Sequence, residues 1–223
     1  MIRKYKVLLL ILFMVALFSL QLVDAKIKPQ KALADIIITV DPGHGGRDSG
    51  TMYGKIYEKD LNLAISKILK TELESAGATV YLVREDDSDL SSQWDAQKKR
   101  GDLYRRILFI QEKKSDLYLS IHINWGQGSG QEVLYHPINK KNILLATSIQ
   151  DQFKKDFKAE RKIKKTNLYL YSNTRVPGVL IECGFLSNAD DRYLLQQESY
   201  QQRLATSIRK GVETYLKQLS LEE

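Results

Sequence analysis

Apolar residues along this chain repeat with two spacings, one typical of strands and the other of amphipathic helices. The β-branched run Ile36–Asp41 reads as a buried strand. Pro42 should end that strand because proline cannot donate to a sheet ladder. Similar apolar runs predict further strands at 79–84, 116–124, 131–136, 167–171 and 178–183.

Helices are predicted where apolar residues recur every three or four positions. One opens at Glu58 and stops at Gly77, a residue that suits a helix C-terminus. Others are expected at 98–112, 141–157 and 200–219. Strands that alternate with helices predict an α/β fold whose sheet is covered on both faces. The short link from Asn124 to Gln131 predicts one antiparallel pair, so the sheet should be mixed.

The first 25 residues look like a targeting segment. Arg3, Lys4 and Lys6 precede an almost wholly apolar run over 7–23, and cleavage after Ala25 would suit signal peptidase. The segment is either a cleaved signal peptide or an N-terminal membrane anchor, with a buried core helix as the remaining alternative. Export would make the chain extracytoplasmic, secreted or anchored to the outer face of the cytoplasmic membrane. Residues 26–35 are expected to be a linker, and 36–223 the folded domain.

Composition narrows the class of protein. The chain has 223 residues, 43% hydrophobic and 27% charged, which fits one α/β domain. Its net charge of +7 favours anionic surroundings, either nucleic acid, a membrane surface or a wall polymer. Nucleic acid is excluded as a partner if the chain is exported. The basic run Lys154–Lys165 is either a solvated helix face or a surface attracted to anionic glycan or lipid.

Four side chains stand at comparable places in this pattern. His44 follows the first strand within a glycine loop, Glu58 opens the first helix, and His122 and Glu182 lie near strand ends. Each of these residues also has an explanation that needs no catalysis. His44 could simply lie in a turn, and Glu58 could be an acid favoured at a helix N-terminus. His122 could be a core histidine, and Glu182 a buried carboxylate that needs a partner.

The ends of parallel strands meet at one edge of a sheet, so these four side chains should converge. Two histidines and a glutamate would suit Zn²⁺ with a fourth position left for water, whose pKa the metal lowers. Glu182 could then take the water's proton and pass it to a leaving amine. Cys183 is the one cysteine, which excludes an internal disulfide and Cys-rich zinc modules.

The segments around these residues resemble the signature blocks of the zinc-dependent N-acetylmuramoyl-L-alanine amidases. The blocks are Asp41-Pro42-Gly43-His44-Gly45-Gly46, Glu58-Lys59-Asp60-Leu61-Asn62-Leu63, Ser120-Ile121-His122-Ile123-Asn124 and Ile181-Glu182-Cys183-Gly184-Phe185-Leu186-Ser187-Asn188. All four follow the family's order, although the third usually has Ala where Ile123 stands. The resemblance implies a three-layer α/β/α sandwich around a mixed, mainly parallel sheet.

The same resemblance implies zinc bound at His44, Glu58 and His122, with Glu182 as the catalytic glutamate. The family cleaves the amide between the lactyl group of N-acetylmuramic acid and L-alanine in peptidoglycan. The N-terminus and the small size look most like the sporulation and germination amidases, which act on spore cortex and prepare muramic lactam.

Two alternatives to this activity stay open at the level of sequence. The chain could be a peptidoglycan-binding or regulatory protein on an amidase scaffold, or an amidase active only with an activating or zinc-loading partner protein. Among other polar residues, Cys183 should pack in the core and His136 should be structural or at the surface. Arg84 should pair with Glu85 or Asp86 rather than with a substrate carboxylate.

Overall fold

The structure is a computed structural model that describes residues 13, 14 and 31–221. The predicted signal or anchor segment, apart from Phe13 and Met14, lies outside these residues, as does the first half of the predicted linker. Within the described ranges, no helix is both long and apolar enough to cross a membrane.

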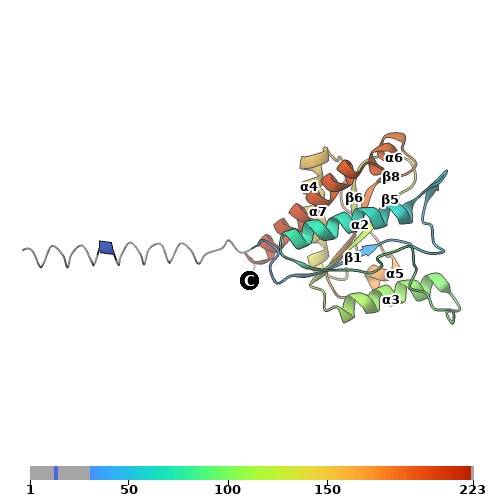
Figure 1. Cartoon of the computed structure of the whole chain (residues 1–223), viewed down its shortest axis with the longest axis horizontal. Coiled ribbons are helices and arrows are strands. Elements are labelled where there is room, and N and C mark those ends of the chain that lie inside the picture. Colours follow the sequence, from blue (N-terminus) through green and yellow to red (C-terminus); the bar gives the residue numbers. More distant parts are fainter. Residues whose placement is uncertain (1–12, 15–30, 222–223) are drawn as a thin grey trace, which may run out of the picture.

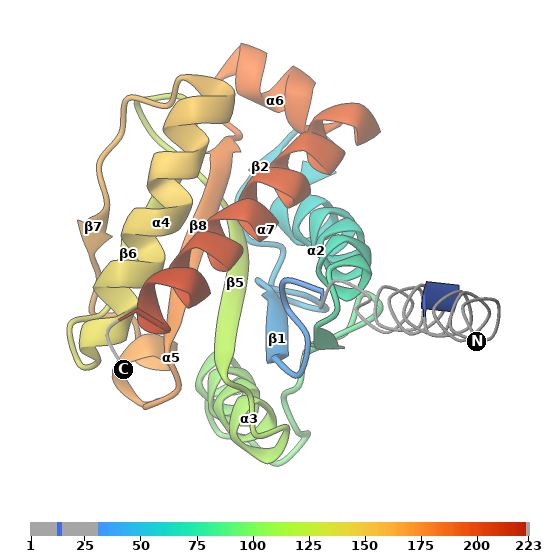
Figure 2. The ribbon, with the colours of Figure 1, turned by 90° about the vertical axis from the view of Figure 1, so that its left-hand side faces the viewer.

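Six strands form one sheet in the order β4-β1-β5-β8-β6-β7. They are β1 (Ile37–Pro42), β4 (Thr79–Leu82), β5 (Leu117–Asn124), β6 (Glu132–Tyr135), β7 (Lys164–Lys165) and β8 (Gly178–Phe185). Every neighbouring pair is parallel except β6 and β8, which are antiparallel. Figure 2 shows the long strands β5 and β8 side by side near the centre of the fold. The predicted mixed, mainly parallel sheet is confirmed.

Helices cover both faces of this sheet, which confirms the three-layer arrangement. Figure 1 shows α2, α4 and α7 together on one side of the strands and α3 with α5 on the other. Their bounds are α2 (Glu58–Ser75), α3 (Lys98–Glu112), α4 (Lys140–Phe157), α5 (Tyr169–Ser172) and α7 (Glu198–Leu219). A short helix, α6 (Ala189–Leu195), and a hairpin of β2 (Met52–Tyr53) and β3 (Ile56–Tyr57) were not predicted from the sequence.

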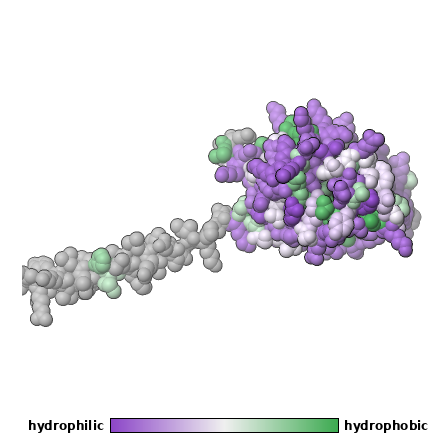
Figure 3. Space-filling model, turned by 90° about the horizontal axis from the view of Figure 1, so that it is seen from above, coloured by the Kyte–Doolittle hydropathy of each residue, from purple (hydrophilic) through white to green (hydrophobic). Residues whose placement is uncertain are grey.

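The core divides into two clusters because side chains alternate across each strand. Leu119 and Ile121 of β5 join the large cluster beneath α2, α4 and α7. Tyr118, from the same strand, belongs to a smaller cluster with Ile107 and Ile110 of α3. The face of the domain seen in Figure 3 is largely hydrophilic with small scattered apolar areas, in keeping with the 27% of charged residues in the chain.

The strand predicted at 167–171 is wrong, since its residues form the loop and helix α5. Leu170 and Tyr171 are both buried, and consecutive residues cannot both face the same side from a strand. A helical turn lets both pack against the sheet. The edge beside β6 is taken by Lys164–Lys165 instead.

The sheet contains one antiparallel pair, as predicted, but one of its two strands is not the one expected. The strand at 132–135 pairs with β8, not with β5. Strand β8 comes from much later in the sequence and lies between them. Hydrophobic pattern sets which segments are strands but not which strands are neighbours.

The expected linker also ends earlier than predicted. Leu33 is fully buried in the large core cluster, and its amide donates to the carbonyl of Ala76 at 2.9 Å. Residues 31–35 therefore pack against the C-terminus of α2 and belong to the folded unit.

Candidate active site and metal centre

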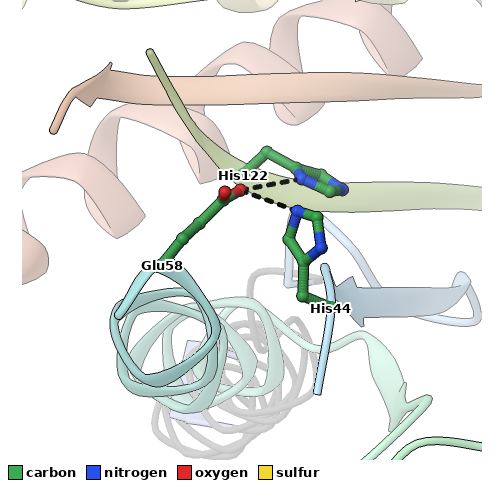
Figure 4. A group of neighbouring side chains, drawn as sticks. All are labelled: His44, Glu58 and His122. Atoms are coloured by element: carbon green, nitrogen blue, oxygen red, sulfur yellow. Dashed lines mark hydrogen bonds and ion pairs between the residues drawn. The ribbon is translucent and has the colours of Figure 1, made fainter. Parts of the chain in front are cut away.

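Three side chains from three different elements converge at the carboxyl edge of the sheet. His44 lies just after β1, Glu58 is the first residue of α2, and His122 lies near the end of β5. In the parallel pairing of β1 with β5, Pro42 stands opposite Ile121, so the residues after Pro42 come close to His122. One ligand atom from each of the three side chains lies within 4.8 Å of the others (Figure 4).

The geometry of these side chains suits a tetrahedral metal ion. Glu58 Oε1 lies 3.1 Å from His44 Nε2 and 3.0 Å from His122 Nδ1. Bonds of about 2.0–2.2 Å to one Zn²⁺ would place neighbouring ligand atoms roughly 3.3 Å apart. Asp48 Oδ2 is 3.0 Å from His44 Nδ1, so a carboxylate orients the ring and leaves Nε2 facing Glu58. The residues present therefore fit a zinc site.

The charges at this site attract a cation. Burial opposes ionisation of Glu58, but hydrogen bonds and attraction from His122 and His44 outweigh it and hold its pKa below the usual range. Burial likewise opposes protonation of His44, yet Asp48 and Glu58 raise the pKa of its imidazole to about 9. Asp48 and Glu58 thus favour positive charge at His44, so a proton and a metal ion would compete for this ring.

Glu182 stands beside this cluster on the neighbouring strand. It lies opposite His122 in the pairing of β5 with β8, and its Oε2 atom is buried with no hydrogen-bond partner among the described residues. Burial, together with repulsion from Glu58 and Glu132, raises the pKa of Glu182 to about 8. A carboxyl oxygen buried without a partner is costly, which points to a functional role.

These four residues border one cavity of about 510 Å³. The sheet contributes Ser120 and Glu182, α3 contributes Leu103 and Arg106, and residues 168–171 around α5 line it as well. Since α3 and α5 lie on the same face of the sheet, the cavity lies between them and is open toward the cluster of histidines. A substrate entering there would meet Glu182 and the candidate metal together.

Sequence reasoning missed the polar network behind the cluster. Asp41 is buried and accepts from Arg106 Nη1 and, at 2.7 Å, from Ser120 Oγ. A signal for Arg106 was present: it lies on the apolar stripe of its helix beside Ile107 and Ile110, where an arginine needs buried partners.

The prediction for Arg84 is wrong. Its side chain is buried and donates to backbone carbonyls, including Pro42 at 3.1 Å and Gly43 at 3.0 Å. Its contact with Asp86 is also to a carbonyl oxygen and not to the carboxylate. The end of β4 points Arg84 inward, toward the loop that carries His44.

Other singled-out residues have structural surroundings. Cys183 is fully buried in the core, as predicted. Asn188 caps α6 by accepting from the amides of Asp190 and Asp191. His136 is half-buried, and its Nδ1 accepts from the amide of Ile138 at 3.1 Å.

Comparison with known proteins agrees with the motifs. Residues 38–214 match the family model described as N-acetylmuramoyl-L-alanine amidase. The germination-specific N-acetylmuramoyl-L-alanine amidase of Bacillus subtilis is 37% identical over 194 residues, covering 82% of this chain and 81% of that protein. The probable cell wall amidase LytH of Staphylococcus aureus is 31% identical over 205 residues, covering 88% of this chain and 64% of LytH.

A solved structure shares the fold. The CwlD amidase from Clostridioides difficile, in complex with the GerS lipoprotein, superposes with a TM-score of 0.77 at 34% identity. The match covers 82% of this chain and 99% of that one. The resemblance predicted from four short motifs is thus confirmed over most of the chain.

Proposed function

The chain belongs to the N-acetylmuramoyl-L-alanine amidase family, and we propose that it is a zinc-dependent member acting on peptidoglycan outside the cytoplasm. The bond cleaved is the amide between the lactyl group of N-acetylmuramic acid and the L-alanine of the stem peptide. The observation that carries the proposal is the convergence of His44, Glu58 and His122 beside Glu182, whose buried Oε2 atom has no hydrogen-bond partner in the described part of the chain.

His44 Nε2, Glu58 and His122 Nδ1 would hold the metal. When bound, Zn²⁺ supplies Lewis acidity that polarises a carbonyl and acidifies water. Glu182 takes a proton from the attacking water at Oε2 and delivers it to the alanine nitrogen as the carbon–nitrogen bond breaks. The lactyl carbon gains the water's oxygen and becomes a carboxylic acid, while the peptide leaves with a free amino terminus. The raised pKa of Glu182 suits a group that must both accept and return a proton near neutral pH.

The site of action in our proposal is the cell wall, including spore cortex. Similarity to a germination-specific amidase supports cortex as the substrate, where removal of stem peptides would permit muramic lactam formation. The predicted signal peptide or anchor at 1–25 would deliver the domain to that side of the membrane.

A partner protein is part of the proposal. The neighbouring CwlD structure is a complex with a lipoprotein, which supports an activating or zinc-loading partner for this chain as well. Turnover or zinc content that rises when a candidate lipoprotein is added to the purified chain would identify such a partner.

The decisive assay follows new amino termini. The full-length chain is incubated with purified peptidoglycan, with and without chelator, and newly released amino termini are labelled and identified. We expect new N-terminal alanine that disappears with chelator and returns with zinc. If the chain holds stoichiometric zinc but releases no alanine, even with a partner added, the binding-scaffold alternative replaces the amidase.

Glu182→Gln separates metal binding from proton transfer. The variant should keep its zinc affinity and lose about 10²–10⁴-fold in kcat, because an amide cannot accept the water's proton. Glu74→Gln, which changes a half-exposed carboxylate on α2 paired with Lys70, is the matched control and should hydrolyse normally. Hydrolysis at the wild-type rate by Glu182→Gln would remove Glu182 from the mechanism.

A further inference from the structure

The loop that carries His44 is held from two sides by buried arginines. Arg106 of α3 donates from Nη2 to the carbonyl of His44 at 2.7 Å and from Nη1 to that of Pro42 at 2.9 Å. Arg84, just after β4, donates to the carbonyls of Pro42 and Gly43. Three successive carbonyl groups are thereby tied to guanidinium groups, so the peptide planes of the loop cannot turn freely.

His44 needs such a restraint because of its backbone conformation. Its φ is 62°, in the left-handed region that a residue with a side chain rarely adopts. The bond to its carbonyl fixes the peptide plane that follows it. Together with φ, the orientation of that plane sets the direction of the Cα–Cβ bond of His44, and hence where Nε2 of the imidazole ring points.

Arg106 is itself rigidly placed. Only 2% of the residue is exposed, and all five of its N–H donors are used. Two of these donors bond the carbonyl groups of the loop. Two others bond Asp102, one turn earlier on α3, with Nε 2.7 Å from Oδ2. The fifth bonds Asp41 at the end of β1. Ser120 holds the second oxygen of Asp41. A lysine could not reproduce this planar set of contacts.

We propose that Arg106 is a positioning residue for the metal ligand His44. All of its N–H donors bond protein groups, so it would act on the metal site through the His44 loop. Its guanidinium group holds the His44 backbone in the left-handed conformation that aims Nε2 at Glu58, and so sets the affinity and coordination geometry of the metal site. The inference rests on the proposed function only in treating His44 as a ligand.

The test measures metal binding in the full-length chain, without peptidoglycan. Arg106→Lys keeps the charge but loses the fork of donors. Arg105→Lys is the matched control, because Arg105, the residue before Arg106 on α3, pairs with Asp95 and not with the His44 loop. Zinc affinity is measured by competition with a chromophoric chelator, coordination geometry by the visible spectrum of the Co²⁺-loaded protein, and folding by the melting temperature of the metal-free protein.

Arg106→Lys should bind zinc about 10–100-fold more weakly, as is typical when a group that supports a ligand is changed, with an altered cobalt spectrum. The control should match the wild type in both. Asp102→Asn, which removes one anchor of Arg106 but spares its carbonyl contacts, should weaken zinc binding less and serves if Arg106→Lys does not fold.

Wild-type zinc affinity and cobalt spectrum in a folded Arg106→Lys, or in Asp102→Asn if Arg106→Lys does not fold, would overturn the inference. An equal loss in Arg105→Lys would also do so, because it would reflect general weakening of α3. Metal-dependent release of alanine by the wild type would leave the proposed function standing in either case.

Discussion

A methyl group at position 43 should disturb the metal centre directly. A Cβ built on Gly43 would lie 2.3 Å from Cε1, 2.4 Å from Nε2 and 2.7 Å from Nδ1 of His122. Ordinary contact begins at 3.4 Å. The backbone of Gly43 cannot retreat, because its amide donates to Ile121 at 2.9 Å and its carbonyl accepts from Asn62 at 3.1 Å. The imidazole of His122 must therefore move.

The size of that movement sets the expected loss. The difference between 2.3 and 3.4 Å requires a displacement of about 1 Å, and an error of that size at a catalytic centre can cost about 100-fold in rate. A 100-fold loss in kcat/KM corresponds to about 2.7 kcal/mol. Zinc affinity should fall as well, since the ring that moves is a proposed ligand. The assays are chelator competition for zinc and alanine release from peptidoglycan.

Gly54→Ala provides the control for Gly43→Ala. Gly54 lies in the turn between β2 and β3 with φ 60°, and nothing lies within 4 Å of its added Cβ. Alanine there should cost about 1–2 kcal/mol of backbone strain without touching His122. Should folded Gly43→Ala bind zinc and hydrolyse peptidoglycan like the wild type, the reasoning from this contact is wrong.

Two further predictions concern stability, both measured by urea unfolding. Asp41→Asn should lose about 3 kcal/mol at pH 7, because it leaves the buried guanidinium of Arg106 with Asp102 as its one carboxylate. Burial opposes ionisation of Asp41, but Arg106 and Ser120 outweigh it and hold its pKa below the usual 3.8. The difference in free energy of unfolding between the wild type and the variant should therefore persist down to about pH 4 and shrink as the pH falls further. A difference that grew in acid would contradict this. Leu33→Ala should cost about 2–5 kcal/mol, as for a buried leucine, whereas a loss below about 0.5 kcal/mol would show that residues 31–35 are a linker after all.

The hydrophobic pattern predicted an element correctly where the structure of a segment depends on its own residues. The helix that opens at Glu58 and the strand ending at Pro42 were found because their periodicity and terminal residues are local properties. The strand expected at 167–171 failed because apolar residues there pack as a helical turn against a sheet that only the rest of the chain provides. The hairpin at 52–57 carries too few residues to show a period.

The candidate site likewise has features that the sequence predicts and features that only the folded structure shows. The sequence by itself pointed to the four residues that we propose carry the chemistry, since each stands at the end of a strand or the start of a helix, and motifs of that kind are local. Asp48 orients His44 from four residues further along the same loop, but only the tertiary structure decided that Arg106 and Arg84 hold that loop. These contacts join residues distant along the chain, such as Arg106 and His44, and no periodicity encodes which buried carbonyl group an arginine will meet.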